Sequence, residues 1–169
     1  MKRIESILDR VINWFAGLST ALIAVSCIIV CVEIISRYFF NSPQDWVVET
    51  TEYLILWFTF LGAAWVLKMD GHVKIDIVLH GRSQKFRSLI SAITSFICAA
   101  ECFLIFWIGV QVCIDYYQRG IVIPKTLQPP KYPILAVIPL GSFLLFVQFL
   151  RITNKHIRLW RELFKKQEN

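Results

Sequence analysis

Residues 46–69 read WVVETTEYLILWFTFLGAAWVLKM, and this stretch decides the fold. Nearly every residue from Tyr53 to Leu67 is apolar, and none carries a charge. With the turns before it, the stretch supplies about 22 helical residues, or roughly 33 Å, which is enough to cross the hydrocarbon core of a bilayer. Ser42-Pro43-Gln44-Asp45 precedes it as a helix start signal. The pattern predicts a membrane-spanning helix with acids at one end and a base at the other.

The composition of the whole chain agrees with a membrane protein. It has 169 residues, of which 56% are hydrophobic, and a mean hydropathy of +0.57. Such a chain is too apolar for an ordinary soluble domain and too short for a large transporter. We expect one small helical membrane domain that covers residues 1–169.

Three further apolar stretches predict three further spans. Together with the first, the expected spans are 11–38, 46–68, 86–117 and 133–152, followed by a basic tail at 153–169. The predicted fold is an all-α integral membrane protein with four transmembrane helices and amphipathic ends that lie at the interface. Pro139 lies inside the fourth span, where we expect it to kink the helix.

The distribution of positive charge predicts the orientation. The net charge is +6, but the bases lie beside apolar runs rather than in patches with exposed aromatic residues, so nucleic acid is not an expected partner. Fourteen of the eighteen Lys and Arg residues lie in alternate segments: the two ends and the connection between spans two and three. Both termini should therefore face the cytoplasm. The turn that carries His72 and Asp76 should face the same side, with Trp46 outside.

The sequence lacks the motifs of the common enzyme classes. It contains no nucleotide-binding loop, no HExxH and no Ser or Cys nucleophile motif with a plausible base. The three histidines fall in predicted cytoplasmic segments, which excludes paired axial haem ligands inside a bundle. The five cysteines lie in apolar stretches and are expected to be packing residues. We predict no catalytic residue, no cofactor and no metal site.

Charged residues inside or beside the spans are the first candidates for function. Glu33 and Arg37 are four residues apart, which allows them to pair on one helix face. Glu101 lies near the middle of the third span, where an ionised acid that faces lipid is costly. Two interpretations follow: a hydrogen bond to another helix or subunit, or a proton relay. Glu49 and Glu52 favour the amino end of their own helix, or they contact a basic partner.

Small and aromatic residues are the second group of candidates. Gly62 and Gly141 are expected at close helix contacts, within this chain or against a larger subunit. Trp57 belongs to a set of mid-span aromatic residues that offers a broad packing surface, on a partner or within the chain. His72 and Asp76, four apart after a glycine, are expected to fix a cytoplasmic turn by hydrogen bonds.

The order of these residues resembles the small integral membrane subunit, the Q-type subunit, of tripartite ATP-independent periplasmic (TRAP) transporters. The resemblance covers about residues 11–152 and is carried by Trp46, Glu49 or Glu52, Trp57, Leu61-Gly62-Ala63, His72, Asp76, Thr126, Pro133 and Ile138-Pro139-Leu140-Gly141. It implies a four-helix subunit of a bacterial inner membrane that packs on a large transport subunit. It also implies sodium-coupled uptake of organic acids that a periplasmic substrate-binding protein delivers. Membrane lipids complete the expected partners.

A different class of membrane protein remains as the alternative. Small proton-coupled exporters of this size can operate with one intramembrane carboxylate, and Glu101 offers one. The sequence shows no obvious repeat between its halves of the kind that many carriers use. An accessory subunit explains more of the sequence than an autonomous exporter does.

Overall fold

The computed structural model describes residues 2–42, 44–69, 84–122 and 129–168, and this part of the chain is almost entirely helical. The helices are α1 (Lys2–Phe40), α2 (Asp45–Met69), α3 (Gln84–Arg119), α4 (Lys131–Leu135) and α5 (Val137–Glu168). The chain has four helical segments that are long and apolar enough to cross a membrane, among the described residues. They are α1, α2, α3 and the segment formed by α4 and α5 together. The prediction of an all-α protein with four transmembrane helices is confirmed.

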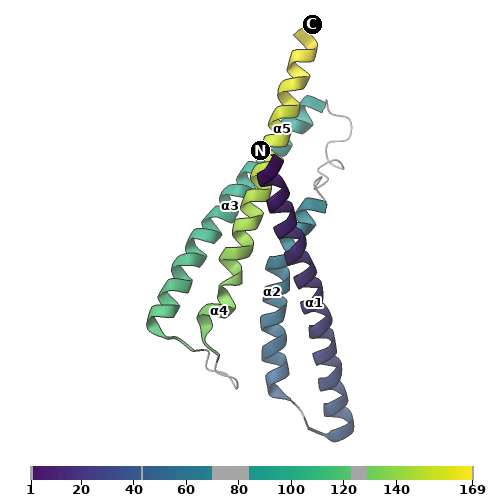
Figure 1. Ribbon diagram of the computed structural model, residues 1–169, viewed down its shortest axis with the longest axis vertical. Coiled ribbons are helices and arrows are strands. Elements are labelled where there is room, and N and C mark those ends of the chain that lie inside the picture. Colours follow the sequence, from purple (N-terminus) through teal and green to yellow (C-terminus); the bar gives the residue numbers. More distant parts are fainter. Residues whose placement is uncertain (1, 43, 70–83, 123–128, 169) are drawn as a thin grey trace.

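The four long helices form an open layer rather than a closed bundle. The extensive contacts are those of α3 with α5, of α5 with α2, and of α2 with α1. The order across the layer is therefore α3, α5, α2, α1, and α3 and α1 are its edges (Figure 1). The pairs α1–α2 and α3–α5 diverge toward the end of the layer that carries the α1–α2 and α3–α4 connections, while both termini lie toward the other end.

Small residues allow the helices to approach each other. A Cβ atom at Gly141 of α5 would lie 2.6 Å from the Phe60 carbonyl oxygen of α2, and one at Gly62 of α2 would lie 2.8 Å from the Ser19 hydroxyl oxygen of α1. The Ser19 hydroxyl donates a hydrogen bond of 2.8 Å to the Phe58 carbonyl oxygen. Because α2 meets α5 on one side and α1 on the other, these contacts hold the middle of the layer together.

Aromatic rings fill the contact between α3 and α5. Phe103 packs on Phe146, and Phe106 packs on Phe143, each with ring centroids 5.4 Å apart and planes tilted by about 45°. Closer to the connecting end, a Cβ atom at Gly109 would lie 3.2 Å from the Pro139 ring. Toward the termini, buried Ile12, Ala64 and Leu144 join α1, α2 and α5 in a small apolar cluster.

The helical path of the fourth span is interrupted just before Pro139. α4 ends at Leu135, Ala136 forms a turn, and α5 begins at Val137. A proline ring clashes with the carbonyl group four residues before it, which here belongs to Leu135. The Ala136 N–H still donates to the Tyr132 carbonyl oxygen at 3.0 Å. Pro139 thus lies in the first turn of α5, where its missing N–H costs little.

The helices are longer than a bilayer requires. α1 has 39 residues and α3 has 36, which correspond to helices of about 59 Å and 54 Å against a hydrocarbon core of about 30 Å. Long helices of this kind tilt or extend beyond the hydrocarbon core. The expected spans lie within these helices, except that the span at 133–152 begins in α4. The tail at 153–168 continues α5 without a break.

Candidate functional site

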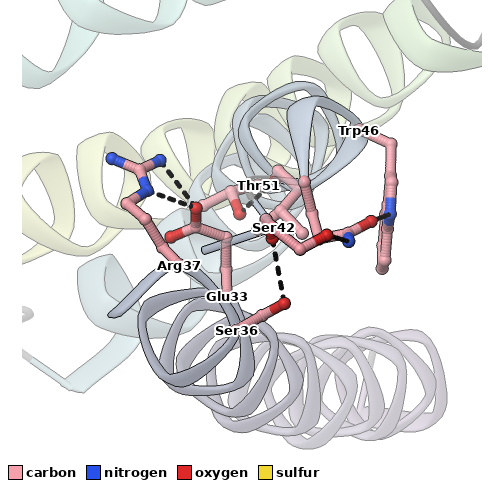
Figure 2. Close-up of polar contacts among 8 residues, drawn as sticks. Glu33, Ser36, Arg37, Ser42, Trp46 and Thr51 are labelled. Carbon is pink, nitrogen blue, oxygen red and sulfur yellow. Dashed lines mark hydrogen bonds and ion pairs between the residues drawn. The ribbon is translucent and has the colours of Figure 1, made fainter. Parts of the chain in front are cut away.

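The α1–α2 connection is held by a chain of hydrogen bonds. The Ser36 hydroxyl donates to the Ser42 carbonyl oxygen at 3.0 Å, and the Trp46 indole Nε1 donates to Gln44 Oε1 at the same distance. Gln44 Nε2 in turn donates to the Ser42 hydroxyl oxygen at 3.3 Å (Figure 2). Asn41 takes a φ of 49°, a left-handed conformation that asparagine tolerates better than most residues. These bonds tie Ser42 to the end of α1 and fix the Trp46 side chain through Gln44.

Glu33 and Arg37 form the predicted ion pair one turn before this connection. Both Arg37 Nε and Nη2 approach Glu33 Oε1, at 2.8 Å and 2.6 Å, as Figure 2 shows. The Glu33 side chain is 9% exposed and the Arg37 side chain is 54% exposed. The pair neutralises a carboxylate that is buried against the layer, and the prediction that these two residues pair is confirmed.

The acids of α2 lie in different environments. Glu49 is buried, with 8% of its surface exposed, whereas Glu52 is exposed. Trp46 remains 41% exposed on the same part of the helix. Glu52 and Trp46 thus lie at the surface at this end of the layer, while Glu49 is buried within the packing of the chain itself.

The middle of the layer separates the remaining candidates. Gly62 and Gly141 lie at contacts between helices of this chain, as described above, and Trp57 is half-buried. Glu101 is different because it is exposed on α3, the edge helix. Among the described residues, it forms no hydrogen bond and no ion pair.

A polar cluster that the sequence analysis did not predict lies at the end with the two termini. Asp9 of α1 accepts a hydrogen bond of 2.8 Å from Arg151 of α5 and lies 3.6 Å from Lys68 of α2. Lys68 also donates to Asn13 of α1 at 3.0 Å, and Arg151 donates to Gln148 at 3.3 Å. We call these five residues the three-helix polar cluster, because it joins α1, α2 and α5.

The three-helix polar cluster could have been predicted from one signal only, the expected depth of its charged residues in the membrane. The charge distribution predicts that Asp9, Lys68 and Arg151 lie at the same side of the membrane, each near the end of its span. One acidic and two basic side chains at the same depth are candidates for pairing. Sequence separation hides the pairing, since Asp9 and Arg151 are 142 residues apart.

The predicted turn at His72 and Asp76 lies outside the described residues, as does Thr126. The assignments of the other candidates to a partner stay predictions. Orientation across the membrane also stays a prediction, although the two termini do share one end of the layer (Figure 1).

Comparison with known proteins identifies the family. Residues 26–161 match the family described as tripartite ATP-independent periplasmic transporters, DctQ component. The chain is 24% identical to the C4-dicarboxylate TRAP transporter small permease protein DctQ of Vibrio cholerae, over 88% of this chain and 70% of that protein.

Two further relatives carry similar names. A putative TRAP transporter small permease protein of Haemophilus influenzae is 26% identical over 65% of this chain and 70% of its own length. The ectoine TRAP transporter small permease protein TeaB of Halomonas elongata is 20% identical over 91% of this chain and 78% of its own length. The matched residues include α2, α3, α4, most of α5 and the last 15 residues of α1. The chain therefore belongs to the DctQ component family of tripartite ATP-independent periplasmic transporters, as a multi-pass membrane subunit.

Proposed function

We propose that this chain is the small membrane subunit of a TRAP transporter and supports a large transport subunit by packing against it. The family match over residues 26–161 carries the proposal. The open layer of helices also supports the proposal, because many large apolar side chains on both edge helices are exposed. Such a surface is covered by lipid or by another membrane protein.

The substrate and the coupling ion are the finer part of the proposal. The subunit serves sodium-coupled uptake of an organic acid that a periplasmic substrate-binding protein delivers. One relative is named for C4-dicarboxylates and another for ectoine, so the family name alone does not select the substrate. We assign the substrate and sodium sites to the large subunit and a scaffolding role to this chain.

The two ends of the layer receive different partners in this proposal. The end with Trp46 and Glu52 faces the periplasm, where the exposed carboxylate of Glu52 suits a basic patch on the substrate-binding protein. The end with both termini faces the cytoplasm, in accord with the distribution of Lys and Arg. His72 and Asp76 fix the cytoplasmic turn between α2 and α3. Amphipathic α5 beyond Arg151 lies against lipid head groups.

Reconstitution of defined components tests this function. The chain, the large subunit of the same transporter and the substrate-binding protein are purified together and placed in liposomes with an inward sodium gradient. Uptake of a labelled organic acid is expected only when all three proteins and the gradient are present. The chain alone should transport nothing.

A proton-driven flux from liposomes that contain this chain alone would overturn the proposal and favour the exporter alternative. In that case Glu101→Gln should abolish the flux, since an amide cannot carry the proton. Under the proposed function, the same substitution leaves the uptake by the complete complex largely intact.

A further inference from the structure

Glu101 occupies an exposed position in the middle of a membrane-spanning helix. It is the fourteenth residue of a candidate span that runs from Ser88 to Arg119 on α3, so about 20 Å of helix precedes it and about 27 Å follows it. A carboxylate at this depth needs a hydrogen-bond donor, because hydrocarbon offers none. No described residue of this chain supplies it.

The position of Glu101 around α3 directs it away from its own chain. Ala99, which is 1% exposed and faces α5, lies about 160° around the helix from Glu101 at about 100° per residue. Phe103 and Phe106, which contact Phe146 and Phe143 of α5, lie about 160° and 140° around the helix from Glu101. The described helices therefore offer no partner on the side of α3 that carries Glu101.

Residues at heptad spacing extend the surface around Glu101 in both directions. Residues 94, 101 and 108 are seven apart, and so are residues 97, 104 and 111. The two sets alternate along α3 like the a and d positions of a helix-packing seam. All six side chains are exposed: Thr94, Ile97, Glu101, Leu104, Ile108 and Gln111. We call this set the Glu101 face. It combines aliphatic residues with three hydrogen-bonding side chains, and thus matches a protein helix better than acyl chains.

The neighbouring exposed strip of α3 has a different character. Phe96 and Trp107 lie about 100° around the helix from Ile97 and Ile108, respectively. Their strip is aromatic and contains no charged or amide side chain between these two positions. Lipid can cover such a strip without loss of hydrogen bonds.

No base of α3 lies near Glu101, since no Lys or Arg occurs between Arg87 and Arg119. Arg151, in the middle of α5, pairs with Asp9 in the three-helix polar cluster instead. A symmetric pair of two copies through this surface would oppose Glu101 to Glu101, which is unfavourable for like charges. The occupant that fits is a helix of a different protein.

We propose that the Glu101 face binds one transmembrane helix of the large transport subunit, and that this helix presents a hydrogen-bond donor to the Glu101 carboxylate. The inference rests on the proposed function and specifies the surface through which the two subunits assemble. It makes α3, an edge of the layer, the side on which the large subunit lies. The remaining helices then extend the scaffold away from it.

Site-specific photo-crosslinking in the co-expressed complex tests the position of the partner. The photoreactive residue benzoylphenylalanine replaces Ile97 or Ile108 on the Glu101 face, or Phe96 or Trp107 on the aromatic strip. Each pair has the same depth and similar exposure, at 52% against 61% and 56% against 56%. Adducts with the large subunit are expected at Ile97 and Ile108 and at least fivefold weaker at Phe96 and Trp107, given the angle of about 100° between the strips.

Four results would overturn the proposal, and they separate its parts. Adducts mainly from Phe96 and Trp107, no adducts from any of the four positions, or an adduct of twice the mass of this chain would each contradict the assigned face, while co-purification of the large subunit would still support the proposed function. Absence of the large subunit from the purified material would contradict the proposed function itself.

Substitution of Glu101 tests the hydrogen bond. Glu101→Leu should lower the recovery of the large subunit with this chain by about tenfold, since one intramembrane hydrogen bond is lost. Glu101→Gln retains an acceptor and should change recovery less than about twofold. Equal recovery with Leu and with wild type would overturn the hydrogen bond, and so would an equal loss with Gln and Leu. A normal amount of each variant in the membrane is the control.

Discussion

A methyl group at Gly141 would lie 2.6 Å from the Phe60 carbonyl oxygen and 2.7 Å from Phe60 Cβ. Backbone atoms cannot turn aside as a long side chain can, so α5 and α2 must separate to admit it. Gly141→Ala should lower the free energy of unfolding by about 1–3 kcal/mol. The midpoint temperature of the chain in detergent, followed by loss of the monodisperse peak in size-exclusion chromatography, measures the effect.

Gly17 provides the matched control for this substitution. It lies within α1, and nothing would lie within 4 Å of an added Cβ atom. Gly17→Ala should leave the midpoint unchanged or raise it, because alanine favours a helix over glycine by about 1 kcal/mol. A midpoint for Gly141→Ala at or above the wild-type value would contradict the close contact of α2 with α5.

A second residue-scale prediction concerns Gly62 and Ser19. A Cβ atom at Gly62 would meet the Ser19 hydroxyl oxygen at 2.8 Å but Ser19 Cβ only at 3.6 Å, which is ordinary contact. Gly62→Ala alone should therefore destabilise the chain by about 1 kcal/mol through displacement of the hydroxyl. Ser19→Ala removes that oxygen, so the double variant should be more stable than the two single effects predict. Additive midpoints would show that the two residues do not interact.

At the scale of the helices, the three-helix polar cluster predicts a dependence on salt. Asp9 accepts from Arg151 and lies beside Lys68, and all three side chains are partly exposed. Asp9→Asn should lower the free energy of unfolding by about 1 kcal/mol at low ionic strength, and the difference should shrink near 1 M salt, where exposed charges are screened. Midpoint temperatures measured in parallel at both salt concentrations test this.

Asp115 supplies the control for Asp9. It pairs with Arg119 at 2.7 Å within a single helix, and both side chains are well exposed. Asp115→Asn should cost only about 0.3 kcal/mol, because the pair joins no two helices. A larger loss for Asp115→Asn than for Asp9→Asn would mean that the cluster does not hold α1, α2 and α5 together.

Individual helices were predictable from the sequence, but their neighbours were not. Length and hydropathy decide the existence of each span, and local spacing predicts the pair of Glu33 and Arg37, because these signals lie within one helix. Helix pairing depends on which face of an almost uniformly apolar helix meets which neighbour. The contact of Gly141 with Phe60 and the hydrogen bond of Arg151 to Asp9 join residues far apart in the chain. The spacing of residues within a single helix therefore cannot predict them.

Glu101 shows the same limit at a candidate site. The sequence predicts that an acid at mid-span needs a partner, which is a statement about solvation. It does not say on which side of α3 the acid lies relative to α5, since Ala, Phe and Gly on the packed side are as apolar as the residues around Glu101. The exposed position of Glu101 was visible only once α3 was placed against α5.

At the scale of the whole molecule, the shared position of the two termini makes orientation testable. In a variant whose five native cysteines are replaced by alanine, single cysteines are placed at Gln118 or at Asn154, both exposed. A membrane-impermeant maleimide should label Gln118→Cys in intact cells and Asn154→Cys only after permeabilisation, as the distribution of Lys and Arg predicts. The cysteine-free variant controls for background, and the reverse pattern would contradict the predicted topology.

The open arrangement of α3, α5, α2 and α1 has a consequence for the lifetime of the protein in the cell. Because few of the side chains that the structure describes are buried, much of the free energy that keeps the chain folded must come from what covers it. A partner that binds only the folded form stabilises it in proportion to the logarithm of the free partner concentration. Copies made in excess of the partner would therefore be the first to unfold and to be degraded, so that turnover itself would match the amounts of the two subunits.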